Sequence, residues 1–284
     1  MTQPVLSTPG VLQDAEPAKW RQHRYGLSPE RWDRFAGRTF WITGAGTGFG
    51  RSIAVALAAA GARVILSGRR RSKLEESIEE MKTFAVPTTL CHAVECDITD
   101  PQDIERACAR VIALTQSLHG LVNNAALPST ANPYPLQEDS LGNWEKLLRT
   151  NVTAQWQLTR RLMPYMLKGS EGRVLFVTSE AGWASTPGFG PYNVSKAALN
   201  ALAASVAAEY AERFPEADIQ VNTLVPGEAK TEMNRRSRES PYAVVSMTLL
   251  LLSHPKGGPN GRFFHRDGRH LSFAYTTPYE RKLG

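Results

Sequence analysis

Positions 39–50 of the chain read TFWITGAGTGFG, and the run IAVALAAA follows at positions 53–60. An apolar strand, a glycine-rich turn and an apolar helix therefore follow one another directly. Glycines let the backbone bend tightly and approach a ligand closely. The amino end of a helix offers unpaired N–H groups and partial positive charge, which suit a pyrophosphate. This order predicts a dinucleotide-binding βαβ unit, and a tight strand-to-helix turn without a ligand is the alternative interpretation.

The spacing of the glycines differs from the dinucleotide fingerprint G-x-G-x-x-G. Arg51 stands where the third glycine would fall after Gly46 and Gly48. The segment from Thr43 to Gly50 fits the pattern T-G-x-x-x-G-x-G instead. The turn therefore belongs to a variant of the dinucleotide-binding motif.

A second motif, Tyr192-Asn193-Val194-Ser195-Lys196, places a phenol and an ammonium on one face of a helix. A free tyrosine loses its proton near pH 10, so it is a poor proton donor at neutral pH unless a positive charge stabilises the phenolate. We expect Lys196 to lower the pKa of Tyr192. Ser179 follows an apolar strand-like run at positions 174–177. A surface Tyr/Lys pair on an amphipathic helix is the alternative interpretation.

Together, these motifs resemble the short-chain dehydrogenase/reductase superfamily, in its shorter single-domain branch, over about residues 36–268. The resemblance implies catalysis by Ser179, Tyr192, Lys196 and Asn151. Asn151 would complete a tetrad and hold a water that connects Lys196 to solvent. Ala126 departs from the family pattern, which has glycine there. The cofactor-binding residues implied are Gly44, Thr47, Gly48, Phe49, Gly50, Asp97, Ile98, Asn123, Asn124, Ala125, Tyr192, Lys196, Pro226, Gly227 and Thr231.

Three arginines follow the strand-like run at positions 63–67, where NAD-binding proteins carry an acid that bonds the ribose diol. This chain has Gly68 and Arg69 there and no carboxylate. A guanidinium forms charge-assisted, often bidentate bonds with a 2′-phosphate. We therefore expect Arg69 to bind the cofactor, with NADP(H) preferred and NAD(H) as the alternative. A solvated helix start is the other interpretation of the arginines.

Length and composition fit one large α/β domain. The 284 residues are 42% hydrophobic and 21% charged, without an abrupt change in composition. We assign an N-terminal extension to residues 1–35, a Rossmann-type domain to 36–270 and a C-terminal tail to 271–284. No apolar run reaches membrane-spanning length and no secretory signal is evident, so we expect a cytoplasmic protein with no membrane partner.

The charge and cysteine patterns argue against two other classes of protein. The net charge of +6 is spread along the chain, without the basic, aromatic-interleaved face of a nucleic-acid binder. Cys91, Cys96 and Cys108 are too few and too irregularly spaced for a disulfide framework or a zinc site. We expect no nucleic-acid partner and no metal.

The remaining pattern alternates strands with helices. This predicts a doubly wound parallel sheet of about seven strands, with helices on both faces and a ligand crevice at the carboxyl ends of the strands. The expected strands are 39–42, 63–67, 88–96, 120–123, 173–178, 219–225 and 261–265, and the expected helices include 72–84, 143–167, 191–214 and 247–252.

The expected reaction is hydride transfer between a nicotinamide cofactor and a carbonyl compound or secondary alcohol. Ser179 would bond to the developing alkoxide, and Tyr192 would act as general acid or base. One alternative is a catalytically silent cofactor sensor or scaffold, since fold alone does not fix function. A nucleotide-sugar epimerase or dehydratase is the other, although it would need a larger region after Gly227.

Residues 228–242 form the substrate lid in the family, and here this segment is short and basic. One hypothesis is an anionic substrate bound by Arg235 and Arg236; a solvated loop is the alternative. An apolar wall would come from Trp183, Pro187, Phe189 and Tyr242. We also expect residues 17–35 to pack on the body or on a neighbouring subunit, because they are rich in aromatic side chains. The resemblance implies a homodimer or homotetramer.

Overall fold

One eight-stranded sheet forms the centre of the computed structural model, which describes residues 24–83, 86–128, 136–184 and 187–271. Its strands are β1 (Thr39–Thr43), β2 (Arg63–Gly68), β3 (Cys91–Glu95), β4 (Gly120–Asn123), β5 (Glu171–Val177), β6 (Asp218–Val225), β7 (Phe263–His265) and β8 (His270–Leu271). They lie in the order β3-β2-β1-β4-β5-β6-β7-β8. All neighbours pair in parallel except β8, which is antiparallel to β7. The predicted parallel sheet is confirmed, and β8 is an additional edge strand.

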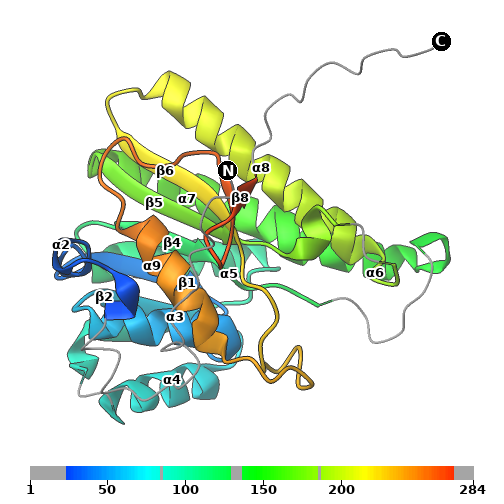
Figure 1. Cartoon of the computed structure of the whole chain (residues 1–284), viewed down its shortest axis with the longest axis horizontal. Helices are drawn as coiled ribbons and strands as arrows, with labels where there is room; N and C mark the ends of the chain where they lie inside the picture. The colour runs from blue at the N-terminus through cyan, green and yellow to red at the C-terminus, as the bar shows by residue number, and fades with distance from the viewer. Residues whose placement is uncertain (1–23, 84–85, 129–135, 185–186, 272–284) are drawn as a thin grey trace, which may run out of the picture.

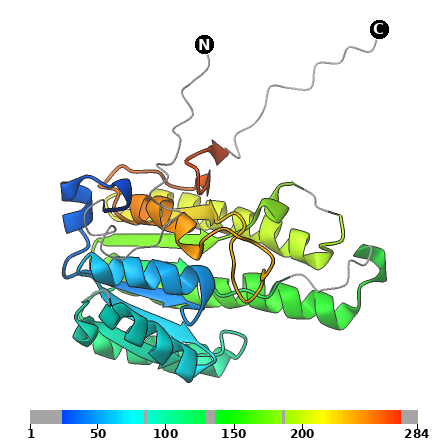
Figure 2. The same cartoon turned by 60° about the horizontal axis from the view of Figure 1, so that its bottom comes forward.

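Helices cover both faces of this sheet (Figures 1 and 2). One apolar layer contains α3 (Gly48–Ala59), α4 (Arg71–Thr83) and α9 (Val245–Leu252). The other contains α5 (Pro101–Leu114), α7 (Ala154–Lys168) and α8 (Pro191–Arg213). At the start of α5, Asp100 caps the helix through the Gln102 N–H, and Pro101 occupies the first turn. The doubly wound Rossmann-type architecture is therefore confirmed.

The strand order reverses its direction between β1 and β4. From β1 the chain proceeds to β2 and β3 on one side, and it returns to β4 and then continues to β7 on the other. Crossover connections leave a crevice at such a point, at the carboxyl ends of the strands. The glycine turn follows β1 and the Asn123-Asn124 turn follows β4. The topology thus places both turns at the switch point where this fold binds ligands.

The helical segment expected at residues 143–167 is present, but it is not one regular α-helix. It consists of α6 (Leu141–Leu148), a π-helical turn η5 (Arg149–Thr153) and α7. A π turn holds one extra residue, so the apolar spacing that predicted the helix continues through it almost unchanged. Asn151 lies inside this turn and is fully buried. The interruption therefore falls on one of the predicted site residues.

The described part of the N-terminal extension packs on the body of the domain. It forms the short helices η2 (Arg24–Gly26) and α2 (Pro29–Asp33), and Tyr25 and Phe35 are buried. The Ser246 hydroxyl of α9 donates a 2.8 Å hydrogen bond to the Tyr25 carbonyl. The Phe35 ring meets Phe40 of β1 edge to face, at 5.6 Å between centroids. Predicted packing is thus confirmed for residues 24–35, while 17–23 lie outside the described residues.

Replacing Phe35 with alanine tests how firmly this extension is held. Its side chain is 1% exposed, so Phe35→Ala should lower the free energy of unfolding by about 3–5 kcal/mol through lost burial and a new cavity. Urea unfolding at one pH measures this. Phe189→Ala is the control, because that ring is 38% exposed and should cost about 1 kcal/mol or less. Equal losses in the two variants would contradict the packing described.

Candidate active site

The glycine turn after β1 forms a cradle in which side chains would not fit. Gly44 and Gly48 have φ values of +65° and +55°, which favour glycine. A Cβ atom at Gly50 would lie 2.3 Å from the Gly44 carbonyl oxygen. Thr47 occupies the N-cap position of α3, but its side chain makes no cap hydrogen bond. The amino end of α3 therefore keeps the N–H donors that a pyrophosphate needs, and this cradle fits a dinucleotide.

Side-chain hydrogen bonds hold the turn after β4 against the turn after β1. The Asn124 amide donates to the Thr43 carbonyl at 2.8 Å, while the Thr43 hydroxyl accepts from the backbone N–H groups of Asn124 and Ala125 at 3.0 Å. Asn123 is fully buried and donates to the Thr159 hydroxyl at 2.9 Å. These bonds fix the width of the crevice between β1 and β4.

Ser179, Tyr192 and Lys196 lie together at the carboxyl end of β5. Ser179 follows this strand, and the two other residues lie in the first two turns of α8. The Ser179 hydroxyl lies close enough to the Tyr192 phenol to lower its pKa. The Lys196 amine lies 5.7 Å from the centre of the Tyr192 ring and donates a 3.0 Å hydrogen bond to the Val177 carbonyl. The structure therefore brings together three of the four predicted catalytic side chains.

Burial sets the protonation of this group. Lys196 is 1% exposed, and loss of solvent lowers its pKa to about 7. Burial also raises the pKa of Tyr192, and the hydrogen bond with Ser179 offsets part of that rise. The expected lowering of the phenol pKa by Lys196 is therefore not found in the protein alone. Burial disfavours the ammonium form of Lys196 and the phenolate form of Tyr192. Lys196 therefore does not make the phenol acidic in the protein alone.

Asn151 connects the loop after β4 to α8. Its side-chain oxygen accepts from the Leu127 N–H at 2.8 Å, and its amide donates to the Leu127 carbonyl and to the Ser195 hydroxyl, both at 3.1 Å. Ser195 in turn donates to the Tyr192 carbonyl at 2.8 Å. The side chain thus supports the helix turn that carries Tyr192. Both N–H groups of the Asn151 amide are already used in these hydrogen bonds. The side chain therefore has no donor left for the water that we expected it to bind.

The other predicted cofactor residues lie at the same edge of the sheet. Arg69 follows β2, Asp97 and Ile98 follow β3, and Pro226, Gly227 and Thr231 follow β6. Asp97 accepts hydrogen bonds from the N–H and hydroxyl of Thr99, at 2.9 and 2.7 Å. Ile98 packs in the apolar layer of α5, α7 and α8, and the partly buried Phe49 packs against the layer of α3, α4 and α9.

One residue of the predicted substrate wall is elsewhere. Tyr242 packs in the apolar layer of α3 and α9, and its hydroxyl donates to Glu80 of α4 at 3.0 Å. The prediction for Tyr242 is therefore wrong, because this carboxylate and the α3 layer draw the ring away from α8. Trp183, Pro187 and Phe189 are exposed, and the Phe189 ring lies 6.1 Å from the Tyr192 ring. These three residues remain candidates for the wall.

Three residues that support the site were not singled out from the sequence. Thr43 binds the Asn124 turn, Ser195 links Asn151 to α8, and Gln155 donates to the Ala125 carbonyl at 3.0 Å. Thr43 opens the glycine motif and Ser195 lies inside the Tyr/Lys motif, so their positions were a usable signal. Gln155 carries no such signal, because its role depends on the π turn before it.

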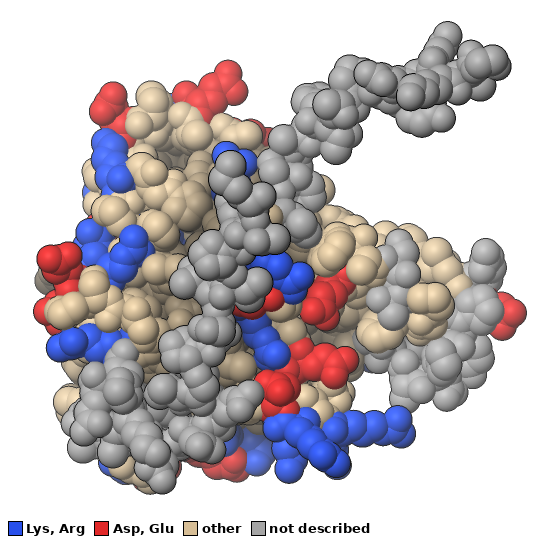
Figure 3. Space-filling model, in the orientation of Figure 1, with Lys and Arg blue, Asp and Glu red and all other residues tan. Residues whose placement is uncertain are grey.

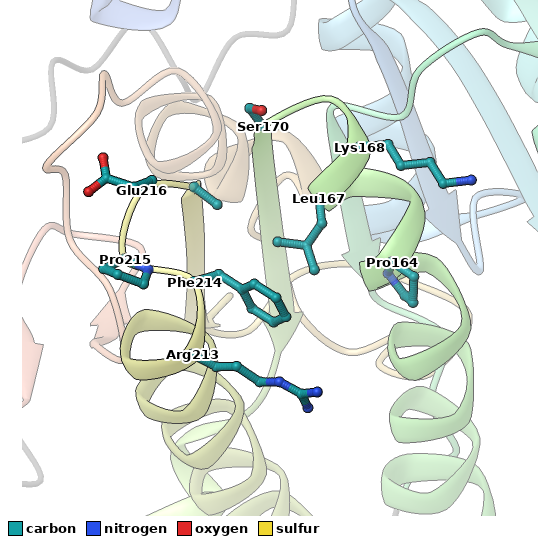
Figure 4. A pocket seen from close by; sticks show the side chains of 9 residues that line it. Pro164, Leu167, Lys168, Ser170, Arg213, Phe214, Pro215 and Glu216 are labelled. Carbon is teal, nitrogen blue, oxygen red and sulfur yellow. The ribbon is translucent and has the colours of Figure 1, made fainter.

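Other features of the described residues lie away from this site. A surface hollow at the carboxyl ends of α7 and α8 is lined by Leu167, Arg213 and Phe214, whereas the site lies at the opposite end of α8 (Figure 4). On the face seen in Figure 3, basic and acidic side chains are interspersed. The three cysteines are buried and free, and burial raises the pKa of Cys91 to about 11.

The described residues lack a metal-binding cluster and a membrane-spanning helix. Among those residues, no group of three or more histidine, cysteine or acidic side chains is arranged to hold a metal ion. None of the helices in that part of the chain has the length and apolar character needed to cross a membrane.

Comparisons with known proteins agree with this geometry. A family model described as short chain dehydrogenase matches residues 38–241. Dehydrogenase/reductase SDR family member 4 of Homo sapiens is 34% identical over 209 residues, covering 72% of this chain and 70% of the human protein. Its counterpart in Sus scrofa is 33% identical over 256 residues, or 87% of each chain.

Solved structures give the same result. A protein described as a short-chain dehydrogenase from Pseudomonas syringae superposes with a TM-score of 0.76 at 26% identity, covering 84% of this chain and 98% of the other. Another from Escherichia coli CFT073, crystallised with NADPH, has a TM-score of 0.74 at 25% identity, with coverages of 83% and 98%. The chain belongs to the short-chain dehydrogenase/reductase family and is a nicotinamide-dependent oxidoreductase.

The burial of Lys196 makes a prediction about stability and pH. The pKa of Lys196 falls from 10.5 to about 7 on folding, so between these values the unfolded chain holds a proton that the folded protein lacks. The contribution of Lys196 to the free energy of unfolding therefore rises with pH, by up to about 1.4 kcal/mol per unit. Between about pH 7.5 and 9.5, urea unfolding should show that the free energy of unfolding of the wild type increases relative to that of Lys196→Met.

The buried cysteines also titrate in this pH range, but they are present in both the wild type and Lys196→Met. Their effect cancels in the difference between the two free energies of unfolding. Lys256→Met, at an exposed position, is the matched control and should show no such trend. If the difference in the free energy of unfolding between wild type and Lys196→Met stayed constant with pH, this would contradict the effect of burial on the pKa of Lys196.

Proposed function

We propose that this protein transfers a hydride between NADP(H) and a carbonyl compound or secondary alcohol, with Tyr192 exchanging the proton. The observation that carries the proposal is the position of buried Lys196, with its amine 5.7 Å from the centre of the Tyr192 ring and Ser179 close to the phenol. This pair lies at the sheet edge that also holds the glycine cradle. Related structures crystallised with NADP and NADPH support the choice of cofactor.

Each residue of the pair has a separate task. The bound nicotinamide supplies or accepts the hydride at the substrate carbon. The Ser179 hydroxyl donates a hydrogen bond to the substrate oxygen and stabilises the charge that develops there. The Tyr192 hydroxyl gives that oxygen a proton in reduction and takes one in oxidation. Because the two hydroxyls are close to each other, they can converge on one substrate oxygen.

Lys196 is proposed to act through charge. Its lowered pKa of about 7 lets the amine be charged or neutral near neutral pH. In its charged form it stabilises the Tyr192 phenolate, and its N–H groups bind the cofactor ribose. Asn151 is proposed to keep this turn of α8 in place through Ser195.

The remaining cofactor contacts are proposed from their places around the cradle. Gly44, Thr47, Gly48 and Gly50 would receive the pyrophosphate, and Arg69 at the end of β2 would favour a 2′-phosphate. Asp97 and Ile98 would line the adenine side. Asn123 to Ala125, and Pro226, Gly227 and Thr231, would line the nicotinamide side.

Two further elements of the proposal concern the substrate and the assembly. Arg235 and Arg236 are exposed on the lid segment and would favour a carbonyl substrate that carries a carboxylate or phosphate. A homodimer or homotetramer would form through α7 and α8. Trp156 of α7 supports this contact, because its large apolar side chain is 39% exposed. The Arg160 guanidinium lies over the Trp156 ring, with its carbon 5.0 Å from the ring centre.

Tyr192→Phe tests the catalytic role. The variant should lose about 10²- to 10⁴-fold in kcat/KM, because the proton donor is absent, while its Kd for NADPH changes little. NADPH oxidation against a panel of ketones and aldehydes, beside calorimetric titration of NADPH, measures both quantities. Tyr210→Phe on the same helix is the control and should retain full activity. Undiminished turnover by Tyr192→Phe would overturn the assignment.

A double change on the lid tests the anionic substrate. Arg235→Ser with Arg236→Ser should lower kcat/KM for carboxylate- or phosphate-bearing ketones by about fivefold or more relative to neutral ones. The loss should appear mainly in KM. Steady-state kinetics on matched anionic and neutral substrates measure the ratio, which an idle solvated loop would leave unchanged.

A further inference from the structure

The three arginines after β2 have different partners in the folded protein. Arg71 pairs within α4, with Glu75 at 2.8 Å. Arg70 pairs with Glu232, a residue 162 positions away, through both of its terminal nitrogens at 3.4 and 2.6 Å. Among the described residues, Arg69 makes no ion pair. The sequence therefore offers three cations at this place, but two of them already have carboxylate partners.

Glu232 belongs to the lid segment, the gold loop between β6 and α9 in Figure 1. The preceding residue, Thr231, packs on the glycine turn, since a Cβ atom at Gly48 would lie 3.0 Å from its methyl group. On the other side of the turn, a Cβ atom at Gly46 would lie 2.9 Å from Lys73 of α4. The glycine turn thus lies between the lid and the start of α4, and the Arg70–Glu232 pair joins these two flanks.

We propose that Glu232 weakens the preference of this enzyme for NADP(H) over NAD(H) by competing with the 2′-phosphate for Arg70, the residue next to Arg69. This inference rests on the proposed function. A carboxylate and a phosphate bind a guanidinium in the same bidentate manner, so one Arg70 fork cannot serve both. NADP(H) must therefore displace Glu232 from Arg70. NAD(H) carries a neutral hydroxyl at that position and does not compete for this guanidinium.

The surroundings of Glu232 support an ionised carboxylate. A hydrogen bond from Arg70, followed by the charges of Arg70, Lys73 and Arg235, holds its pKa below the ordinary range. At neutral pH the group is therefore an anion close to where a second anion would bind. Both partners of the pair are about half exposed, so the effect should be modest, about two- to fivefold, and should shrink as salt is added.

Calorimetric titration of the full chain with NADPH and with NADH, at low and at physiological salt, tests the competition. Glu232→Gln should lower the Kd for NADPH by about two- to fivefold and leave the Kd for NADH unchanged. Glu75→Gln is the matched control, because it removes an equal charge that pairs with Arg71 on α4. It should leave the ratio of the two Kd values as in wild type.

A double-mutant cycle identifies the partner. In an Arg70→Gln background, Glu232→Gln should no longer tighten NADPH, since the disputed guanidinium is absent. A persisting effect in that background, or an equal shift for NADH and NADPH, would overturn the inference while leaving the proposed function intact. Wild-type protein that binds neither cofactor would overturn the proposed function and this inference with it.

Discussion

Lys196 lies inside the protein with its amine bonded to the carbonyl of Val177, the last residue of β5. This one bond joins α8 to the carboxyl edge of the sheet, next to Ser179 and Tyr192. It also takes an amine out of water, which is why the pKa of Lys196 falls to about 7. The same burial raises the pKa of Tyr192. At neutral pH the free protein therefore holds the phenol in its neutral form and the amine near the midpoint of its titration, and we expect the phenol to become more acidic when another positive charge binds beside it.

The rest of the fold positions this pair relative to the glycine cradle. The strand order reverses between β1 and β4, so the turns after both strands open into one crevice, and Asn124 and Thr43 tie them together. From there the π turn carries Asn151, whose amide bonds to Ser195 between Tyr192 and Lys196. A continuous set of hydrogen bonds thus runs from the turn after β4 to the helix that bears the acid.

Local patterns predicted much of this. The glycine turn, the Tyr/Lys spacing and the alternation of strands and helices gave the sheet, the two helical layers and the cluster at the end of β5. Three features depend on contacts between distant segments and could not be predicted. The π turn at Asn151 changes the apolar spacing of the helix very little. The Tyr242 hydroxyl is hydrogen-bonded to Glu80, and Arg70 forms an ion pair with Glu232 from a distant part of the chain. The direction of the Tyr192 pKa shift was also missed, because proximity of Lys196 predicted stabilisation whereas burial dominates.

We conclude that burial keeps the Tyr192 phenol neutral until a cationic cofactor binds beside it. Carbon-13 NMR of the tyrosine Cζ atoms, with Tyr192→Phe for assignment, measures the pKa of Tyr192 directly. In the free protein the account predicts a value above the ordinary 10.0, and with saturating NADP⁺ a clear fall, because a nearby cation favours the phenolate. A pKa already below the ordinary value in the free protein, or one that NADP⁺ does not change, would contradict it.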